Sequence, residues 1–104
     1  MQQSTPTAAL PRLTINYCTR CNWLLRAAWL AQEVLQRFAE EIGEVALRPG
    51  AGGEFTLLLT LEDGSEHLIW ERKRDGGFPE AKQIKQRLRD LIAPQMDLGH
   101  GEPE

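Results

Sequence analysis

The sequence predicts a two-layer α/β sandwich with the element order β-α-β-β-β-α. Two patterns predict it: apolar residues alternate with polar ones in four short segments, as in strands, and recur every three to four residues in two longer segments, as in helices. The chain has 104 residues, which is enough for one domain with a modest core. We expect that domain over residues 12–94, between flexible tails at residues 1–11 and 95–104.

The first strand and the first helix follow one another directly. Apolar and polar residues alternate over residues 13–17, which predicts a strand with β-branched and aromatic content. The spacing then changes, and the apolar residues over 24–42 form one broad face of a helix. We expect Trp29 to be buried on that face, and Gly43 to supply the left-handed cap at the helix end.

Three further strands are predicted over residues 45–47, 55–61 and 67–71. The proline and glycines of residues 49–53 should end the first of them, because such a cluster breaks regular structure. Asp63-Gly64 favours a tight turn, which makes the other two an antiparallel hairpin. In the last strand we expect Leu68 and Trp70 to share one face.

The second helix is predicted to begin with Pro79 in its first turn and to stop before Pro94. Because the first helix joins the first two strands, these strands should be parallel with a right-handed crossover. Together with the antiparallel hairpin they give a mixed four-stranded sheet with two helices packed on it. This arrangement is of the thioredoxin-like type.

Charge and hydropathy exclude several classes of function. The chain has 12 Lys and Arg against 15 Asp and Glu, a net charge of -3, and therefore lacks the basic surplus of many nucleic-acid binders. No apolar stretch approaches the roughly 18 residues that a membrane-spanning helix needs. The first residues also lack the basic and apolar regions of a secretory signal. We therefore expect a cytoplasmic protein with no nucleic-acid or membrane partner.

The two cysteines, Cys18 and Cys21, form a Cys-x-x-Cys motif between the first strand and the first helix. We expect Cys18 to be exposed at the start of the helix and Cys21 to lie one turn further on. Unpaired N–H groups at a helix start favour a thiolate, and the charge of Arg20 acts in the same direction. A second thiol three residues away could then close a disulfide. The motif predicts thiol–disulfide exchange, in which Cys18 attacks and Cys21 resolves the mixed disulfide.

Two other interpretations of the cysteine pair stay open. A structural zinc site usually needs four soft ligands, and the other candidates, His67 and His100, do not form a second ligand pair. We therefore expect no metal, and nothing in the sequence implies an organic cofactor. The pair could also be purely structural, because buried cysteines are common in protein cores.

The residues around the motif have alternative roles. Trp23 could shield a disulfide or offer an exposed contact to a partner. Thr19 and Arg20 are supporting residues inside the motif. The candidate substrate-binding loop could offer free N–H groups to a peptide or to glutathione; its residues are Pro49, Gly50, Gly52 and Gly53. A tight turn that needs positive φ is the favoured explanation of that loop. The basic residues of 72–74 could steer an acidic partner or simply form a solvated surface.

Several separated motifs resemble the selenoprotein W/T/H-related redox family, called the Rdx family, in its bacterial all-cysteine form. The matching motifs are Ile15-x-Tyr17-Cys18-x-x-Cys21-x-Trp23, Pro49-Gly50-x-Gly52-Gly53-x-Phe55, Arg72-Lys73-x-x-Gly76-Gly77-Phe78-Pro79-Glu80-x-Lys82 and Arg89-Asp90-x-Ile92-x-Pro94. They span residues 13–94. The resemblance implies a thioredoxin-like fold and a redox role linked to glutathione or peroxide, with protein thiols or disulfides as partners.

The resemblance also raises two questions about the site. Selenocysteine occupies the position of Cys21 in selenoprotein members, whereas the geometry expected above favours Cys18 as the nucleophile. Thioredoxins place a cis-proline opposite their cysteine pair, and the nearest candidate here is Pro49. Two hypotheses follow: a thiol–disulfide oxidoreductase, or a non-catalytic binding module whose cysteines sense oxidation and switch partner affinity.

Overall fold

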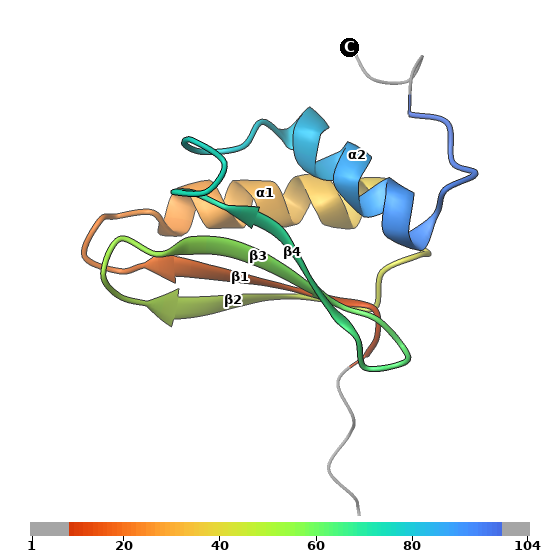
Figure 1. Cartoon of the computed structure of the whole chain (residues 1–104), viewed down its shortest axis with the longest axis horizontal. Coiled ribbons are helices and arrows are strands. Elements are labelled where there is room, and N and C mark those ends of the chain that lie inside the picture. The colour runs from red at the N-terminus through yellow and green to blue at the C-terminus, as the bar shows by residue number, and fades with distance from the viewer. Residues whose placement is uncertain (1–8, 99–104) are drawn as a thin grey trace, which may run out of the picture.

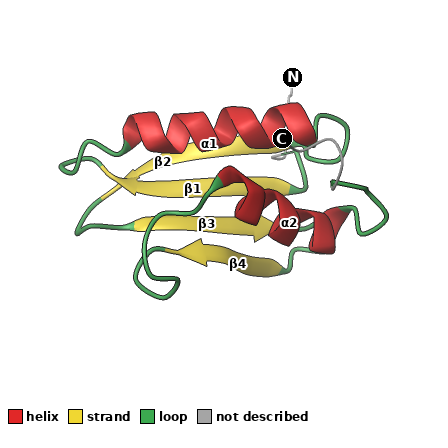
Figure 2. Cartoon of the chain, turned by 90° about the horizontal axis from the view of Figure 1, so that it is seen from above, coloured by secondary structure: helices red, strands yellow, loops and turns green. Residues whose placement is uncertain are grey.

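The computed structural model describes residues 9–98 and has the predicted α/β architecture. Its elements are β1 (Arg12–Cys18), α1 (Leu24–Arg37), β2 (Glu44–Gly50), β3 (Phe55–Thr60), β4 (Glu66–Glu71) and α2 (Ala81–Ile92). Both helices lie on the same face of the sheet, which gives the two layers of a thioredoxin-like sandwich (Figures 1 and 2). Residues 1–8 and 99–104, which hold much of the expected tails and His100, lie outside the described residues.

The sheet is mixed, as the connections predict. Its strand order is β2-β1-β3-β4, with β1 parallel to β2 and antiparallel to β3, and with β3 antiparallel to β4 (Figure 2). The register pairs Cys18 at the end of β1 with Gly50 at the end of β2, and Tyr17 with Phe55 at the start of β3. The glycine loop between β2 and β3 is therefore brought to the same end of the sheet as the first cysteine.

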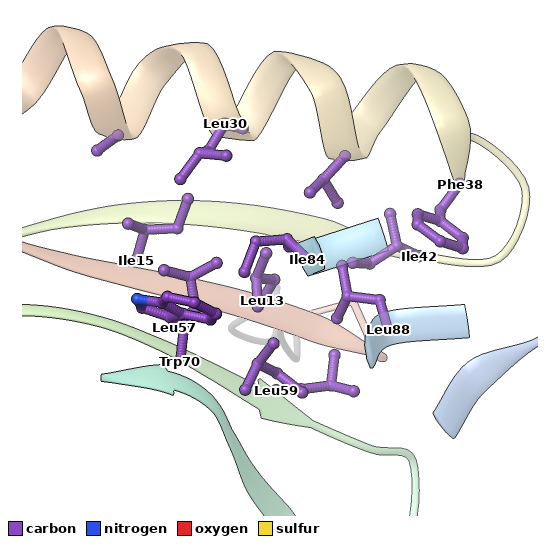
Figure 3. Packing of buried hydrophobic residues seen from close by; sticks show 14 of the residues in the cluster. Leu13, Ile15, Leu30, Phe38, Ile42, Leu57, Leu59, Trp70, Ile84 and Leu88 are labelled. Atoms are coloured by element: carbon purple, nitrogen blue, oxygen red, sulfur yellow. The ribbon is translucent and has the colours of Figure 1, made fainter. Parts of the chain in front are cut away.

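The core lies between the sheet and the two helices (Figure 3). Alternate residues of the central strands are fully buried there, and one stripe of each helix packs over them. The fully buried residues include Leu13, Ile15, Leu57 and Leu59 from the sheet, Leu30 and Phe38 from α1 and the residue after it, and Ile84 and Leu88 from α2. This packing fixes the end of β1, from which the cysteine motif starts.

Helix α1 is shorter than the apolar pattern predicts. It ends at Arg37, and Phe38 is its cap residue, so the expected cap at Gly43 is wrong. Gly43 serves a different purpose: a Cβ there would meet the backbone carbon of Ala9 at 2.8 Å. The expected burial of Trp29 is also wrong, because it lies beside the buried stripe of α1 and is 47 % exposed.

Strand β2 is longer than expected: it includes Pro49 and ends at Gly50, inside the cluster that was predicted to end it. Edge strands tolerate proline because their outer N–H groups need no partner in the sheet. In β4, a register shift pairs Leu57 with Trp70 but Leu58 with Leu68. Ile69 is therefore an extra residue, and the expectation that Leu68 and Trp70 share a face is wrong.

Helix α2 begins after Glu80, whose side chain forms a reciprocal capping box with Gln83. Pro79 therefore precedes the helix, and the expectation that it lies in the first turn is wrong. After the helix end, Leu98 is only 4 % exposed and Met96 packs against the core.

Candidate functional site

The two cysteines lie at the end of β1 and in the turn that joins it to α1. Cys18 is the last residue of β1, and Cys21 lies in the turn that follows. Helix α1 begins only at Leu24, and Asn22 before it has a positive φ of 60°. The expectation that Cys18 stands at the start of the helix is therefore wrong, and the first N–H groups of α1 do not explain its chemistry.

The two sulfurs face each other. Cys21 Sγ lies 2.6 Å from Cys18 Sγ, and both thiols are free. This separation is longer than the roughly 2.05 Å of a disulfide bond, but it needs little movement to become one. Cys18 is only 2 % exposed, because its strand lies between two others, so its expected exposure is wrong. Cys21 is partly exposed.

The pair holds its first negative charge on Cys18. The hydrogen bond from the Cys21 thiol lowers the pKa of Cys18, and the backbone N–H groups of Gly53, Cys21 and Arg20 lower it further against the effect of burial. The same contact with Cys18 raises the pKa of Cys21. A thiolate held by backbone N–H groups and a neighbouring thiol is the reactive form of cysteine.

The glycine loop that follows β2 belongs to this site. Thr19 donates its backbone N–H to the Gly50 carbonyl oxygen at 3.3 Å, which ties the motif to the end of β2. Gly53 has a φ of 74°, a conformation that favours glycine, and its N–H lowers the pKa of both cysteines. The positive φ agrees with the tight turn, and the Gly53 N–H acts on the protein's own cysteines. Binding of a peptide or glutathione by this loop stays a prediction.

Pro49 does not correspond to a thioredoxin cis-proline. It lies in β2, in register with Tyr17, and is exposed. Within residues 9–98 the only cis peptide bond is Leu10-Pro11, so the bond before Pro49 is trans.

Two phenylalanine rings pack against Trp23, which lies two residues after Cys21. Trp23 packs edge-on against Phe78 and Phe55, with ring centroids 4.8 and 6.2 Å away. Arg26 lies over the Phe78 ring at 4.0 Å, and Arg72 lies over the Trp23 ring at 5.0 Å. Trp23 is therefore half-buried, joined to the core on one side and to an arginine on the other.

The sequence analysis did not identify three of these residues as part of the site: Phe55, Phe78 and Arg72. All three belong to the motifs quoted above, but each is remote from the cysteines along the chain. The expected role of the Arg20 charge also changes. Arg20 contributes its backbone N–H to Cys18, whereas the positive charge that lowers the pKa of Cys21 is that of Arg72.

Within residues 9–98, no three His, Cys, Asp or Glu side chains are grouped closely enough to hold a metal ion. His67 lies in β4, with its ring nitrogen 3.3 Å from the Ser65 hydroxyl. None of the described helices combines the length and the apolar character needed to cross a bilayer.

Comparisons with known proteins identify the family of this chain. Its residues 12–90 match the model of the Rdx family. A crystal structure of a selenoprotein W-related protein from Vibrio cholerae is 56 % identical, with a TM-score of 0.70, and the match covers 78 % of this chain and 95 % of that one. A protein from Bordetella parapertussis is 54 % identical with a TM-score of 0.70, over 78 % and 96 % of the two chains. No curated protein matches. With its Cys18–Cys21 pair at the end of β1, the chain belongs to the Rdx family.

Proposed function

We propose that the protein is a thiol–disulfide oxidoreductase that cycles between the Cys18/Cys21 dithiol and an internal disulfide. The observation that carries this proposal is the pair of free sulfurs 2.6 Å apart, one of which has a lowered pKa. A purely structural pair would not need a partly exposed thiol or backbone N–H groups directed at the other sulfur. Membership of the Rdx family agrees with a thiol redox role.

The cycle balances without a metal or an organic cofactor. The Cys18 thiolate attacks one sulfur of a substrate disulfide, a mixed disulfide forms, and the other substrate sulfur leaves as a thiolate. Cys21 then gives its proton to solvent or to that thiolate and attacks Cys18 Sγ. The bond to the substrate breaks, and the substrate ends as two thiols while the protein holds a disulfide. A thiol reductant, such as glutathione, returns the pair to the reduced state by the reverse exchange.

Exposure and charge favour different sulfurs as the nucleophile. Cys21 is the more exposed, but Cys18 carries the lower pKa. We assign the attack to Cys18, because only a thiolate is an effective nucleophile and the Cys21 side chain needs only to turn aside. Cys21 is then placed to resolve the mixed disulfide.

The surface next to the motif suits a protein substrate. Leu24 and Leu25 open α1 directly after the motif and are 47 % and 82 % exposed, and Trp29 follows on the same helix. Exposed apolar side chains beside a reactive site are typical of contacts with a protein partner. We therefore propose cytoplasmic protein disulfides as the main substrates.

Single-cysteine variants test this function. Cys21→Ser should trap a mixed disulfide with a small disulfide probe, detected by mass spectrometry, because no thiol remains to resolve it. Cys18→Ser should form such an adduct about tenfold more slowly at neutral pH, because more backbone N–H groups act on Cys18 than on Cys21. Faster trapping by Cys18→Ser would reverse the two roles. Failure of the wild-type pair to form a disulfide in mild oxidant would end the proposal.

A redox-sensing binding module is the second candidate, and the exposed apolar side chains of α1 favour it. Oxidation would join Cys18 to Cys21 and shift the turn that leads into α1, which would change the affinity for a partner. Turnover with a disulfide substrate and a thiol reductant separates the two candidates. Catalysis of many turnovers supports the oxidoreductase, whereas a change in binding with no turnover supports the sensor.

A further inference from the structure

Arg72 joins three segments that are distant in sequence. Its Nε donates to the Gly53 carbonyl oxygen at 3.3 Å, and its guanidinium lies 5.0 Å above the Trp23 ring centroid. Its backbone N–H donates to the Phe55 carbonyl oxygen at 3.0 Å. One side chain therefore links the glycine loop before β3 to the residue that precedes α1, from a backbone position fixed against β3.

Gly53 is the residue that needs such a link. Its N–H lowers the pKa of both cysteines, while its carbonyl oxygen accepts from Arg72. Glycine adopts many backbone conformations at little cost, so its own chemistry does not hold the N–H in place. Only one φ and one ψ separate the two groups, and a contact that fixes the carbonyl also restricts the direction of the N–H.

We propose that Arg72 is a positioning residue of the thiol site: bound to the Gly53 carbonyl and stacked on Trp23, it keeps the Gly53 N–H directed at Cys18. The thiolate from which exchange starts then depends on a residue that lies beyond β4. The effect on exchange rests on the proposed function, whereas the effect on the thiol can be measured without any turnover.

Charge alone is the competing explanation, and the surroundings contain other charges. Besides Arg72, the segments that meet at this end of the sheet carry the charged residues Arg20, Arg26, Arg48, Glu54, Glu71 and Lys73, and Arg72 and Lys73 both act on the Glu71 carboxylate. A lysine in place of Arg72 keeps the positive charge but loses the planar fork that can donate to a carbonyl while stacked on a ring. The lysine variant therefore separates positioning from charge.

The test compares Arg72→Gln, Arg72→Lys and the control Lys73→Gln, which removes the same charge from the neighbouring exposed position. The ultraviolet absorption of the thiolate is followed against pH in the reduced proteins, and circular dichroism checks the fold. We expect the thiolate fraction at neutral pH to fall about threefold to tenfold in both Arg72 variants, the equivalent of a pKa rise of half a unit to one unit. Lys73→Gln should match the wild type.

Two results would overturn the proposal. One is a wild-type titration in Arg72→Gln, and the other is full recovery in Arg72→Lys, which would leave charge as the only contribution. A separate result bears on the proposed function alone. If the wild type never forms its disulfide, the oxidoreductase fails, yet a shifted thiol titration in both Arg72 variants would still establish Arg72 as the residue that positions Gly53.

Discussion

Arg87 forms a hydrogen bond with the backbone of Ile69 in β4, the strand at the outer edge of the sheet. Its Nη1 donates to the Ile69 carbonyl oxygen at 2.7 Å, and Arg74 Nη2 lies 3.4 Å from the same oxygen. Ile69 is the extra residue of the β4 bulge, so its carbonyl is left without a strand partner. An edge strand with unpaired backbone groups invites pairing with another chain, and the two arginines occupy this position instead.

Replacing Arg87 by alanine should therefore weaken the edge. The guanidinium also lies 4.5 Å over the Trp70 ring, but the side chain is 42 % exposed, so we expect a loss of about 1 kcal/mol in the free energy of unfolding. Urea denaturation measures this loss, and light scattering at high concentration should show more aggregation than in the wild type. Lys82→Ala, at an exposed position of the same helix, is the control. Equal stability of the two variants would contradict the role of Arg87.

Helix α1 offers a matched pair that tests the position of the core. Leu30 is fully buried, whereas Leu25 is 82 % exposed. We expect Leu30→Ala to lower the free energy of unfolding by about 3 kcal/mol and Leu25→Ala by less than about 0.5 kcal/mol. Chemical denaturation of both variants measures the difference. A similar loss in both would mean that the apolar start of α1 is covered in solution.

The ionisation of Asp75 should make the stability of the protein depend on pH. Burial alone would raise its pKa, but the Glu71 N–H at 2.9 Å and the Arg74 guanidinium at 2.8 Å lower it overall. The stabilisation is therefore present above the ordinary pKa of 3.8 and is lost as the pH falls through the lower folded-state value. Asp75→Asn should be less stable than the wild type at neutral pH.

Thermal unfolding at several pH values checks this prediction. The difference in Tm between Asp75→Asn and the wild type should shrink steadily below about pH 4. Asp90→Asn, which removes the same charge from an exposed position, is the control. A difference in Tm that stays constant down to low pH would show that the carboxylate charge of Asp75 is not responsible.

The periodicity of the sequence was sufficient for the order and pairing of the elements, because alternation and helical spacing follow directly from which side chains must leave water. It was not sufficient to predict which apolar residues of α1 are buried. Leu24, Leu25 and Trp29 have the apolar character of core residues, yet the structure leaves them exposed. The pattern shows that a residue is apolar, and only the packing shows whether a second layer is there to cover it.

The cysteine pair could be identified from its spacing and its place after a strand, but the source of its activation could not. The contact between Arg72 and Gly53 joins residues 19 positions apart, and it exists because the sheet register brings the loop after β2 and the end of β4 to the same end of the sheet. The N–H of Gly53 replaces the expected helix start as the stabilising group. Contacts of this kind depend on tertiary geometry and leave no local signal.

Two glycines of the loop after β2 test whether the Gly53 N–H stabilises the thiolate. Gly52 and Gly53 both have positive φ, 65° and 74°, so alanine at either position should carry a similar backbone cost of about 1 kcal/mol. A Cβ at Gly52 meets nothing within 4 Å, whereas a Cβ at Gly53 would lie 3.4 Å from Arg72 Nη2. The strain of a side chain at positive φ would also fall on the residue whose N–H lowers the pKa of both cysteines. Gly53→Ala should therefore reduce the thiolate fraction and the rate of disulfide formation, whereas Gly52→Ala should lose stability alone. Denaturation and thiolate titration of both variants measure the two effects separately, and an equal change of titration in both would assign it to loop strain, with no special part for the Gly53 N–H.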